Sequence, residues 1–506
     1  MFRRLLHALA ALFTGQGLVT VSQVVLVPVF LTAWTSAEYG EWLALTSLTS
    51  YLITFDLGMN AAVINQLTAS YARGDLVEYR RYQHTASAFY AAVVVAGTLL
   101  LAGAVSVVPV TDWLGIVVTP PPVARLVLWI SGTAVLFTLW TGLVTNVFRT
   151  IGRLAVTQWI RNSERLLILV VSLLVLLGGG RMRTQAVAQL AVALAVTAAT
   201  VVAIRLRHPG LTPGVSGADR GTLPALIAPG LYFLLIAVGV SLIEAGPLVL
   251  ISAVLGGVGV ALYATTRTIA NVVRQAMAML SIALQPEIAA LNARENWIAL
   301  RVVHRSLVLG ATTLSAAAAA VLWFEGAEIL RFWTAGRLTP DPALLRALLA
   351  YVLVQAPWWA SGALLTSTNL HTSLATRYAV SSAVGVAAGA VALPWIGSIA
   401  FPLALTVSEL ACCFAHVVGR SCQVSRDDPR AFAAFALPRG AAVIAVSFTG
   451  AFAMHRLMPD GPVRWAVSLL VVTSLALAVF WRFVLSADQR VTLRARVRGA
   501  AATSSG

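Results

Sequence analysis

Two arginines inside one long apolar stretch are the residues whose chemistry stands out first. Arg267 and Arg274 lie in residues 259–286, which contain no proline before the last position, and Asn271 lies between them. Successive helical residues are rotated by about 100°, so positions seven apart face the same side. Guanidinium groups stay charged and bind carboxylate or phosphate oxygens through paired hydrogen bonds. These residues therefore predict a polar face that binds an anion.

Three carboxylates also fall inside apolar stretches, namely Asp56, Glu244 and Glu409. An ionisable residue embedded in a membrane is a candidate functional residue. Each acid could exchange a proton or coupling cation, or it could be a structural partner of a nearby arginine or of a hydrogen-bond donor. Glu244 lies close before Pro247, which removes a backbone hydrogen bond and commonly kinks a helix. Both interpretations stay open for all three acids.

A third charged group, Arg161, Glu164 and Arg165, has the i, i+3, i+4 spacing of helical neighbours. Mutual pairing explains these residues, and contact of the two arginines with a ligand phosphate is the alternative.

No lysine occurs, which excludes a Walker A loop and a cofactor Schiff base. The seven histidines and three cysteines have no metal-ligand spacing. We therefore expect no enzyme activity, no metal and no cofactor.

The composition indicates the elements that must position these side chains. Only 11% of the 506 residues are charged and 59% are apolar, whereas soluble domains are about 25% charged. The sequence predicts an all-α polytopic membrane protein of about fourteen helices. They are expected at 9–33, 42–67, 84–108, 123–148, 155–178, 184–205, 224–254, 258–284, 302–323, 344–367, 373–395, 397–419, 438–457 and 463–485.

The arginines also predict the topology. All 35 basic residues are arginines, and with the N-terminus inside, 25 of them fall on the inner side and eight on the outer side. The two others are Arg267 and Arg274. Cytoplasmic loops carry the excess of positive charge, so both termini are expected in the cytoplasm. The net charge of +16 therefore indicates membrane orientation, and we expect no nucleic-acid partner.

An internal repeat predicts the organisation of these helices. At an offset of 219 residues, Pro28 matches Pro247, Gly40 matches Gly259 and Gln66 matches Gln285. Six helices separate the copies, so both have the same orientation, as in a parallel repeat. We expect two six-helix lobes at 1–208 and 209–422, followed by two helices and a basic tail at 423–506.

Residues 28–81 resemble the N-terminal part of polysaccharide flippases, which belong to the superfamily of multidrug and toxin extrusion carriers and lipid II flippases. The matching pieces are YG.W after the first helix, DLG with an asparagine in the second, and the inner loop A.GD..E.RR. The resemblance implies two lobes that open alternately to each side of a bacterial cytoplasmic membrane. It implies a lipid-linked oligosaccharide cargo for surface polysaccharide synthesis, surrounding membrane lipids, and polysaccharide polymerase or ligase machinery as partners.

Three other functions are alternatives to this one. An ion-coupled antiporter for small cationic compounds would need cavity acids without nearby arginines. A lipid II flippase would use the same physics for a peptidoglycan precursor. A membrane glycosyltransferase or polymerase would carry a large outer loop or an acidic catalytic motif, and the sequence has neither.

Overall fold

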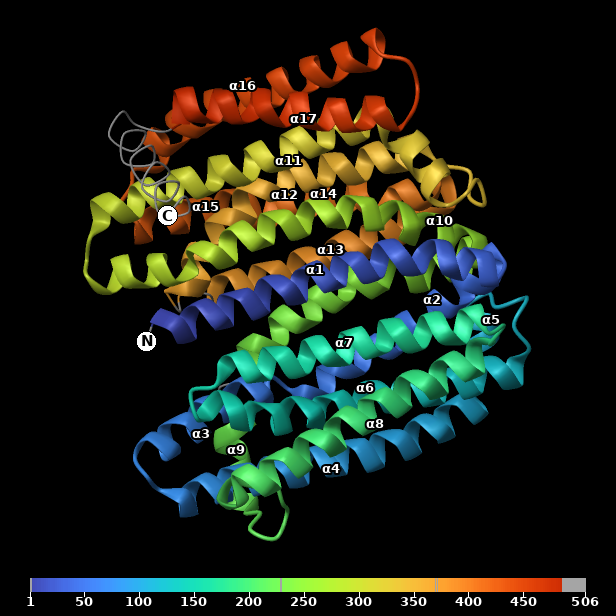
Figure 1. Ribbon diagram of the computed structural model, residues 1–506, viewed down its shortest axis with the longest axis vertical. Coiled ribbons are helices and arrows are strands. Elements are labelled where there is room, and N and C mark those ends of the chain that lie inside the picture. Colours follow the sequence, from blue (N-terminus) through green and yellow to red (C-terminus); the bar gives the residue numbers. More distant parts are fainter. Residues whose placement is uncertain (1, 228–229, 369, 371, 485–506) are drawn as a thin grey trace, which may run out of the picture. The chain divides into compact units, whose positions relative to one another are not determined.

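The computed structural model describes residues 2–227, 230–368, 370 and 372–484, and every regular element in them is a helix (Figure 1). The long helices of the first half are α1 (Phe2–Ala33), α2 (Ser36–Ser50), α3 (Met59–Ala72), α4 (Leu76–Val107), α6 (Pro121–Thr150), α7 (Leu154–Leu177) and α8 (Met182–Arg207). Those of the second half are α10 (Leu231–Ala293), α11 (Trp297–Trp333), α12 (Pro342–Ser367), α13 (Thr372–Ile396), α14 (Ala400–Glu409), α15 (Ala415–Val424), α16 (Pro429–Leu457) and α17 (Pro462–Val479). Shorter helices include η1 (Tyr51–Asp56), α5 (Val110–Trp113) and α9 (Leu223–Ile227). These elements confirm the all-helical fold class.

Ten helical stretches of the described residues are long and apolar enough to cross a membrane. Two of these ten, Leu234–Ala293 and Thr372–Val424, each contain two expected spans. The first is divided at Gly256, whose φ of 68° is not helical, and the second contains α13, α14 and α15. The expected spans at 42–67 and 155–178 are also helical, but η1 breaks one and three charged residues interrupt the other. The prediction of about fourteen helices in a multi-pass membrane protein is confirmed.

The chain forms two compact units. Unit 1 comprises Met1–Thr268, Arg331–Thr339 and Ala375–Leu405, and unit 2 comprises Ile269–Leu330, Pro340–Leu374 and Thr406–Gly506. One boundary falls inside α10, so this helix contributes to both units. The lobes expected from the repeat, 1–208 and 209–422, divide the chain by internal symmetry and stay a prediction.

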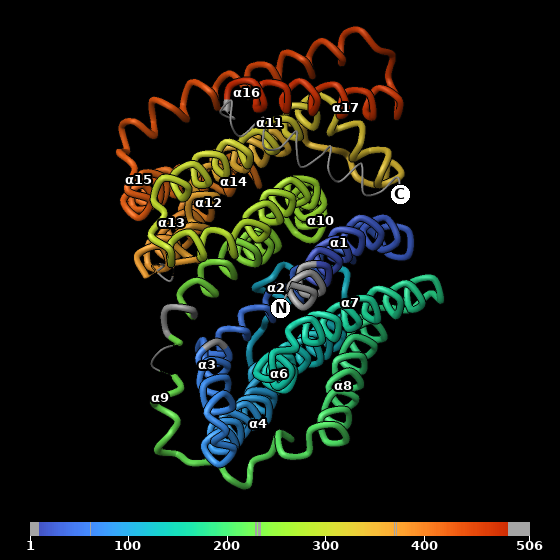
Figure 2. The backbone as a smooth tube through the Cα atoms, turned by 60° about the vertical axis from the view of Figure 1, so that its left-hand side comes forward, coloured from blue at the N-terminus to red at the C-terminus, as the bar shows by residue number. Residues whose placement is uncertain are grey.

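In unit 1, α6 packs against α2, α3, α4, α7 and α8 (Figures 1 and 2). It contributes Leu128 to one apolar cluster, which also contains Trp34 and Trp42. It contributes Leu143 to a second cluster, which contains Tyr90. The bundle is therefore built around α6, and the residues of the motif at the start of α2 belong to its core.

The YG.W motif has a structural explanation. A Cβ atom on Gly40 would lie 1.7 Å from the carbonyl oxygen of Gly257, so only glycine lets α2 and α10 approach this closely. The side chain of Glu41 is 1% exposed and accepts the backbone N–H groups of residues 117–119, each at 2.8 Å. This carboxylate fixes the loop that leads into α6, because it accepts three backbone N–H groups at once, of which that of Thr119 is buried.

In unit 2, α11 packs against the two C-terminal helices, α16 and α17. Apolar side chains of α11 pack with Val443 of α16 and Val472 of α17. Arg464 of α17 forms an ion pair with Glu325 of α11, at a nitrogen–oxygen distance of 2.7 Å, and their side chains are only 2% and 1% exposed. A buried charge that loses its partner is strongly destabilising, so this pair fixes how α17 docks on α11.

Candidate functional site

Asp56 lies at a break in the second expected span. The helix ends as α2 at Ser50, continues as the 3₁₀-helix η1, and restarts as α3 at Met59. Between η1 and α3, Leu57 and Gly58 adopt left-handed φ angles of 50° and 70°. The sequence predicted one continuous helix over 42–67, and the structure corrects this prediction. Discontinuous spans are typical of transporter binding sites because they free backbone polar groups inside the membrane.

The break is required by the contact that Gly58 makes. A Cβ atom on Gly58 would lie 2.0 Å from the carbonyl oxygen of Gly230, which belongs to the segment before α10. No side chain fits there, and the positive φ also favours glycine. The DLG motif of the sequence therefore combines an acid with the glycine that interrupts its helix.

Asp56 is the centre of a polar cluster contributed by four elements of unit 1. Its Oδ1 accepts hydrogen bonds from the amide of Asn60 in α3 and from the hydroxyl of Tyr90 in α4, both at 2.6 Å. Asn60 also donates to the carbonyl of Leu139 in α6 at 3.2 Å, and its own oxygen accepts from Asn146 at 3.4 Å. Tyr90 is fully buried, whereas Asp56 is half-buried. Among the described residues no donor reaches Oδ2 of Asp56, so this oxygen can take a proton or a cation.

Glu409 is held differently in unit 2. It is the last residue of α14, directly before the π-helical turn Leu410–Phe414, and it is fully buried. Its Oε1 accepts from the hydroxyl of Tyr351 at 2.5 Å, and its Oε2 accepts from the indole of Trp358 at 3.1 Å. The amide of Gln355 reaches the two oxygens at 3.3 and 3.4 Å. The guanidinium of Arg274 also interacts electrostatically with this carboxylate.

Arg267 has a partner inside unit 1. Its Nη1 donates to the carbonyl oxygen of Glu244 at 2.7 Å, its Nη2 lies 3.7 Å from the Glu244 carboxylate, and its guanidinium lies 5.5 Å from the centre of the Tyr263 ring. The side chains of Arg267 and Glu244 are 15% and 38% exposed. Arg267 is therefore one partner of Glu244, as one of the alternatives left open by the sequence has it. Arg267 belongs to unit 1, whereas Asn271 and Arg274 belong to unit 2, so one ligand shared by the three residues stays a prediction.

The charged residues Arg161, Glu164 and Arg165 all lie on α7. Arg161 and Arg165 are exposed and Glu164 is half-buried. Arg165 reaches the carbonyl of Gly15 only at 3.5 Å. The contact of the two arginines with a ligand phosphate stays a prediction.

The buried polar residue of this stretch is Asn162, which the sequence analysis missed. Its amide donates to the carbonyl of Ala11 at 2.8 Å, and its Oδ1 has no partner among the described residues. An asparagine inside an apolar span indicates a buried polar contact. From the sequence, only the charged residues on either side of it were considered.

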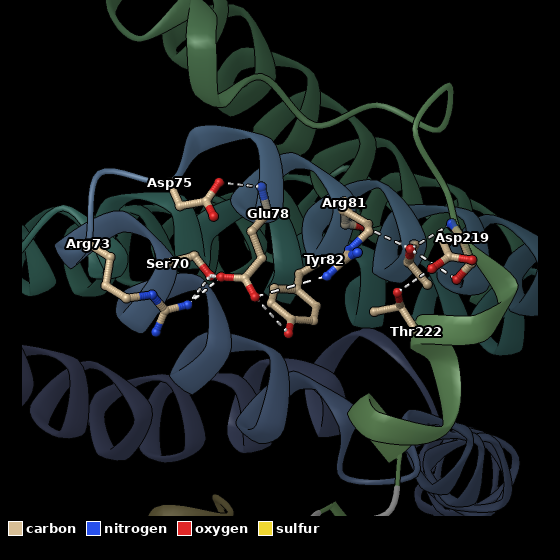
Figure 3. Close-up of polar contacts among 9 residues, drawn as sticks. Ser70, Arg73, Asp75, Glu78, Arg81, Tyr82, Asp219 and Thr222 are labelled. Carbon is tan, nitrogen blue, oxygen red and sulfur yellow. Dashed lines mark hydrogen bonds and ion pairs between the residues drawn. The ribbon is translucent and has the colours of Figure 1, made fainter.

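The A.GD..E.RR motif forms a second polar cluster, between α3 and α4 (Figure 3). Glu78 accepts from Ser70 at 2.8 Å and pairs with Arg73, while its own amide is capped by Asp75 at 2.8 Å. Arg81 lies 4.0 Å from Glu78. The motif therefore closes the turn between the helices, and its acids and bases mainly satisfy each other.

The first turns of α4 also bind the segment that follows α8. Gln83 donates to the carbonyl of Leu211 at 3.0 Å, the Nδ1 of His84 accepts from the amide of Gly217 at 3.0 Å, and Thr85 accepts from the amide of Asp219 at 2.9 Å. Figure 3 shows Asp219 beside Thr222. The hydroxyl of Thr222 and the amide of Gly221 lower the pKa of Asp219. The segment that connects α8 to α9 therefore lies along α4.

No protein-family model and no curated protein matches the sequence. Solved structures do share its fold. One is a multidrug resistance MATE family transporter of the MOP superfamily in an inward-facing conformation, with 13% identity and a TM-score of 0.67 over 83% of this chain and 99% of that chain. The lipid II flippase MurJ in an inward closed conformation is 10% identical, with a TM-score of 0.72 over 93% of this chain and 97% of that chain. The MATE multidrug transporter DinF-BH is 14% identical, with a TM-score of 0.58 over 84% of this chain and 95% of that chain. The chain therefore has the fold that these transporters share.

Proposed function

We propose that this chain is a transporter that moves a polyprenyl-diphosphate-linked oligosaccharide from the inner to the outer leaflet of the cytoplasmic membrane. The fold that it shares with MATE transporters and with MurJ supports a transporter that works by alternating access. MurJ is a flippase of lipid II, which favours a lipid cargo for this chain as well. The sugar part would serve surface polysaccharide synthesis, as the sequence resemblance implies.

The observation that carries the choice of cargo is the presence of Arg267 and Arg274 in α10. An arginine near the middle of a span costs about 3 kcal/mol to insert, so two in one helix favour a role for their charge. The ion pair of Arg267 with the Glu244 carboxylate is loose, at 3.7 Å. A diphosphate could replace this carboxylate, because it accepts charge-assisted bonds from a guanidinium more strongly.

The driving force in this proposal is a cation or proton that exchanges at Asp56. A carboxylate at a helix break, with one oxygen open, can bind the ion when the transporter opens to one side of the membrane. It can release the ion when the transporter opens to the other side. An ion bound at Oδ2 would share the Asp56 carboxylate with the hydrogen bonds from Asn60 and Tyr90, and this shared carboxylate would link the ion to the packing of α3 and α4.

The proposal is tested by the substitutions Arg267→Ala and Arg274→Ala. In cells that lack the wild-type gene, each variant should lower the outer-leaflet amount of polyprenyl-linked oligosaccharide at least about tenfold, as expected for loss of one charge-assisted contact. Membrane insertion should stay normal. Arg207→Ala, which removes an exposed arginine at the end of α8, is the matched control. Normal flipping by both α10 variants would overturn the anion-binding assignment.

A second candidate function is an ion-coupled multidrug antiporter. It is favoured by the MATE structures and by the half-buried acid Asp56. Deletion of the gene separates the two functions. Build-up of an inner-leaflet lipid-linked glycan supports the flippase, whereas unchanged glycans with altered drug sensitivity support the antiporter.

A further inference from the structure

A cavity of about 230 Å³ lies in unit 1 where α1 ends and where α2, α6 and α8 begin. Its lining combines charged, aromatic and apolar side chains, among them Trp34, Glu38, Val123, Arg181, Met182 and Arg183. None of these residues belongs to the Asp56 cluster, to α10 or to the Glu409 cluster. The cavity is therefore a separate candidate site.

The acid in this cavity already has its partners. Glu38 accepts from the amide of Thr35 at 3.0 Å and from the hydroxyl of Thr35 at 3.2 Å. Its own amide donates to the hydroxyl of Thr35 at 3.1 Å, and this bond forms a capping box with the bond from the Thr35 amide at the start of α2. Its other oxygen accepts from Nη1 of Arg181 at 2.8 Å. These contacts occupy the carboxylate with groups of the protein, so it does not offer a free site for a cation.

The two arginines keep donors available. Arg181 uses only Nη1 for Glu38, and its side chain is 75% exposed. Arg183 is exposed and has no hydrogen bond or ion pair with any of the described residues. With one carboxylate paired to one guanidinium, the cavity has a net positive charge. Its open N–H groups suit the oxygens of an anion.

The position of the cavity identifies the anion. Helices α1, α6 and α8 are apolar spans, and the cavity lies where they end or begin. Apolar spans end where the hydrocarbon of a bilayer gives way to lipid headgroups. Val118, Pro120 and Val123 supply an accessible apolar wall beside the arginines. We propose that this cavity binds the phosphate of a phospholipid headgroup, with Arg181 and Arg183 as the donors and the apolar wall against the first part of the lipid chains.

The full chain in detergent, titrated with dioleoylphosphatidylglycerol and followed by native mass spectrometry, tests this proposal. Arg183→Ala should weaken lipid binding about tenfold, since one charge-assisted bond is lost. Arg183 is exposed, so its loss leaves the fold intact. Arg125→Ala is the matched control, because Arg125 is an exposed arginine in the first turns of α6 outside the cavity lining, and it should bind lipid as the wild type does. Glu38→Gln should bind about threefold more tightly, because it frees Arg181.

The remaining arms distinguish the source of the phosphate. Dioleoylglycerol, which has the same chains and no phosphate, should not bind at the concentrations that load phosphatidylglycerol. Inorganic phosphate should not displace the lipid at equal concentration. Equal weakening by Arg183→Ala and Arg125→Ala would overturn the site, and so would binding of dioleoylglycerol. Displacement by inorganic phosphate would overturn the assignment to a lipid headgroup and leave an adventitious ion only.

Discussion

Two membrane-embedded acids, one in each compact unit, are held in opposite ways. Asp56 lies at a break between η1 and α3, is half-buried, and accepts both of its hydrogen bonds on one oxygen. Glu409 lies before a π-helical turn, is fully buried, and accepts bonds on both oxygens from three side chains of α12. Each acid accepts a hydrogen bond from a tyrosine of its own, Tyr90 for Asp56 and Tyr351 for Glu409, and the two differ in how much of the carboxylate remains open.

This difference assigns them different tasks. A carboxylate with every oxygen occupied must break several bonds before it binds an ion, and in a buried site each lost bond is costly. Glu409 is therefore suited to hold α12 and α14 together and to balance the charge of Arg274. Asp56 can bind an ion at Oδ2 without losing its present partners. We infer that Asp56 is the coupling acid and that Glu409 is a structural anchor.

The largest expected effect comes from adding a side chain at Gly58, in the helix break next to Asp56. Gly58→Ala places a Cβ atom 2.0 Å from the Gly230 carbonyl oxygen, so the backbone must move. We expect a loss of about 3 kcal/mol or more in the free energy of unfolding, together with loss of transport. Thermal unfolding of the purified protein measures the first effect. Gly74→Ala is the control, because Gly74 has a φ of 75° with open space around it and should lose only about 1 kcal/mol. Equal losses would mean that the close contact does not matter.

A smaller effect should separate the two acids by stability. Glu409→Ala leaves the buried donors of Tyr351, Gln355 and Trp358 without their acceptor, and we expect a loss of about 2 to 3 kcal/mol. Asp56→Ala should lose about 1 kcal/mol, since its site is half-exposed. Denaturation of both variants in the same detergent makes the comparison. If Asp56→Ala is as unstable as Glu409→Ala, the distinction between anchor and coupling acid is wrong.

The smallest effect concerns the tyrosines. Tyr90→Phe removes one hydrogen bond from Asp56 and should change the cation or proton concentration for half-maximal transport about fivefold. Tyr351→Phe removes the matching bond from Glu409 and should leave that concentration unchanged, with a loss of about 1 kcal/mol in stability. Transport by both variants is measured over a series of ion concentrations. An equal change in the ion concentration for half-maximal transport in both variants would contradict the account.

Much of the fold follows from the sequence because membrane spans are long apolar runs, and the backbone inside them must be helical. The breaks could not be predicted in the same way. At the repeat offset, Gly58 corresponds to Met277, which lies in an uninterrupted part of α10, so the repeat does not indicate the break. The contact that selects glycine at position 58 comes from Gly230, which is 172 residues away along the chain.

The candidate site was predicted in part for a related reason. Embedded charges are visible in the sequence, so Asp56, Glu409 and Arg267 could be singled out. Their partners Tyr90 and Tyr351 are ordinary residues of apolar helices, and spacing along the chain does not indicate which helices pack together. The pairing of Arg267 with Glu244 was one of the open alternatives in the sequence. The structure places these two residues together across the break at Gly256.

The central claim is that ion coupling depends on Asp56. Its most direct test is the rate at which a labelled polyprenyl-diphosphate oligosaccharide changes leaflet in proteoliposomes, with and without an imposed cation or proton gradient. The account predicts that the gradient accelerates flipping by the wild type and by Glu409→Gln, and that it has no effect on Asp56→Asn. Acceleration of Asp56→Asn to the wild-type extent, or loss of the response in Glu409→Gln alone, would contradict it.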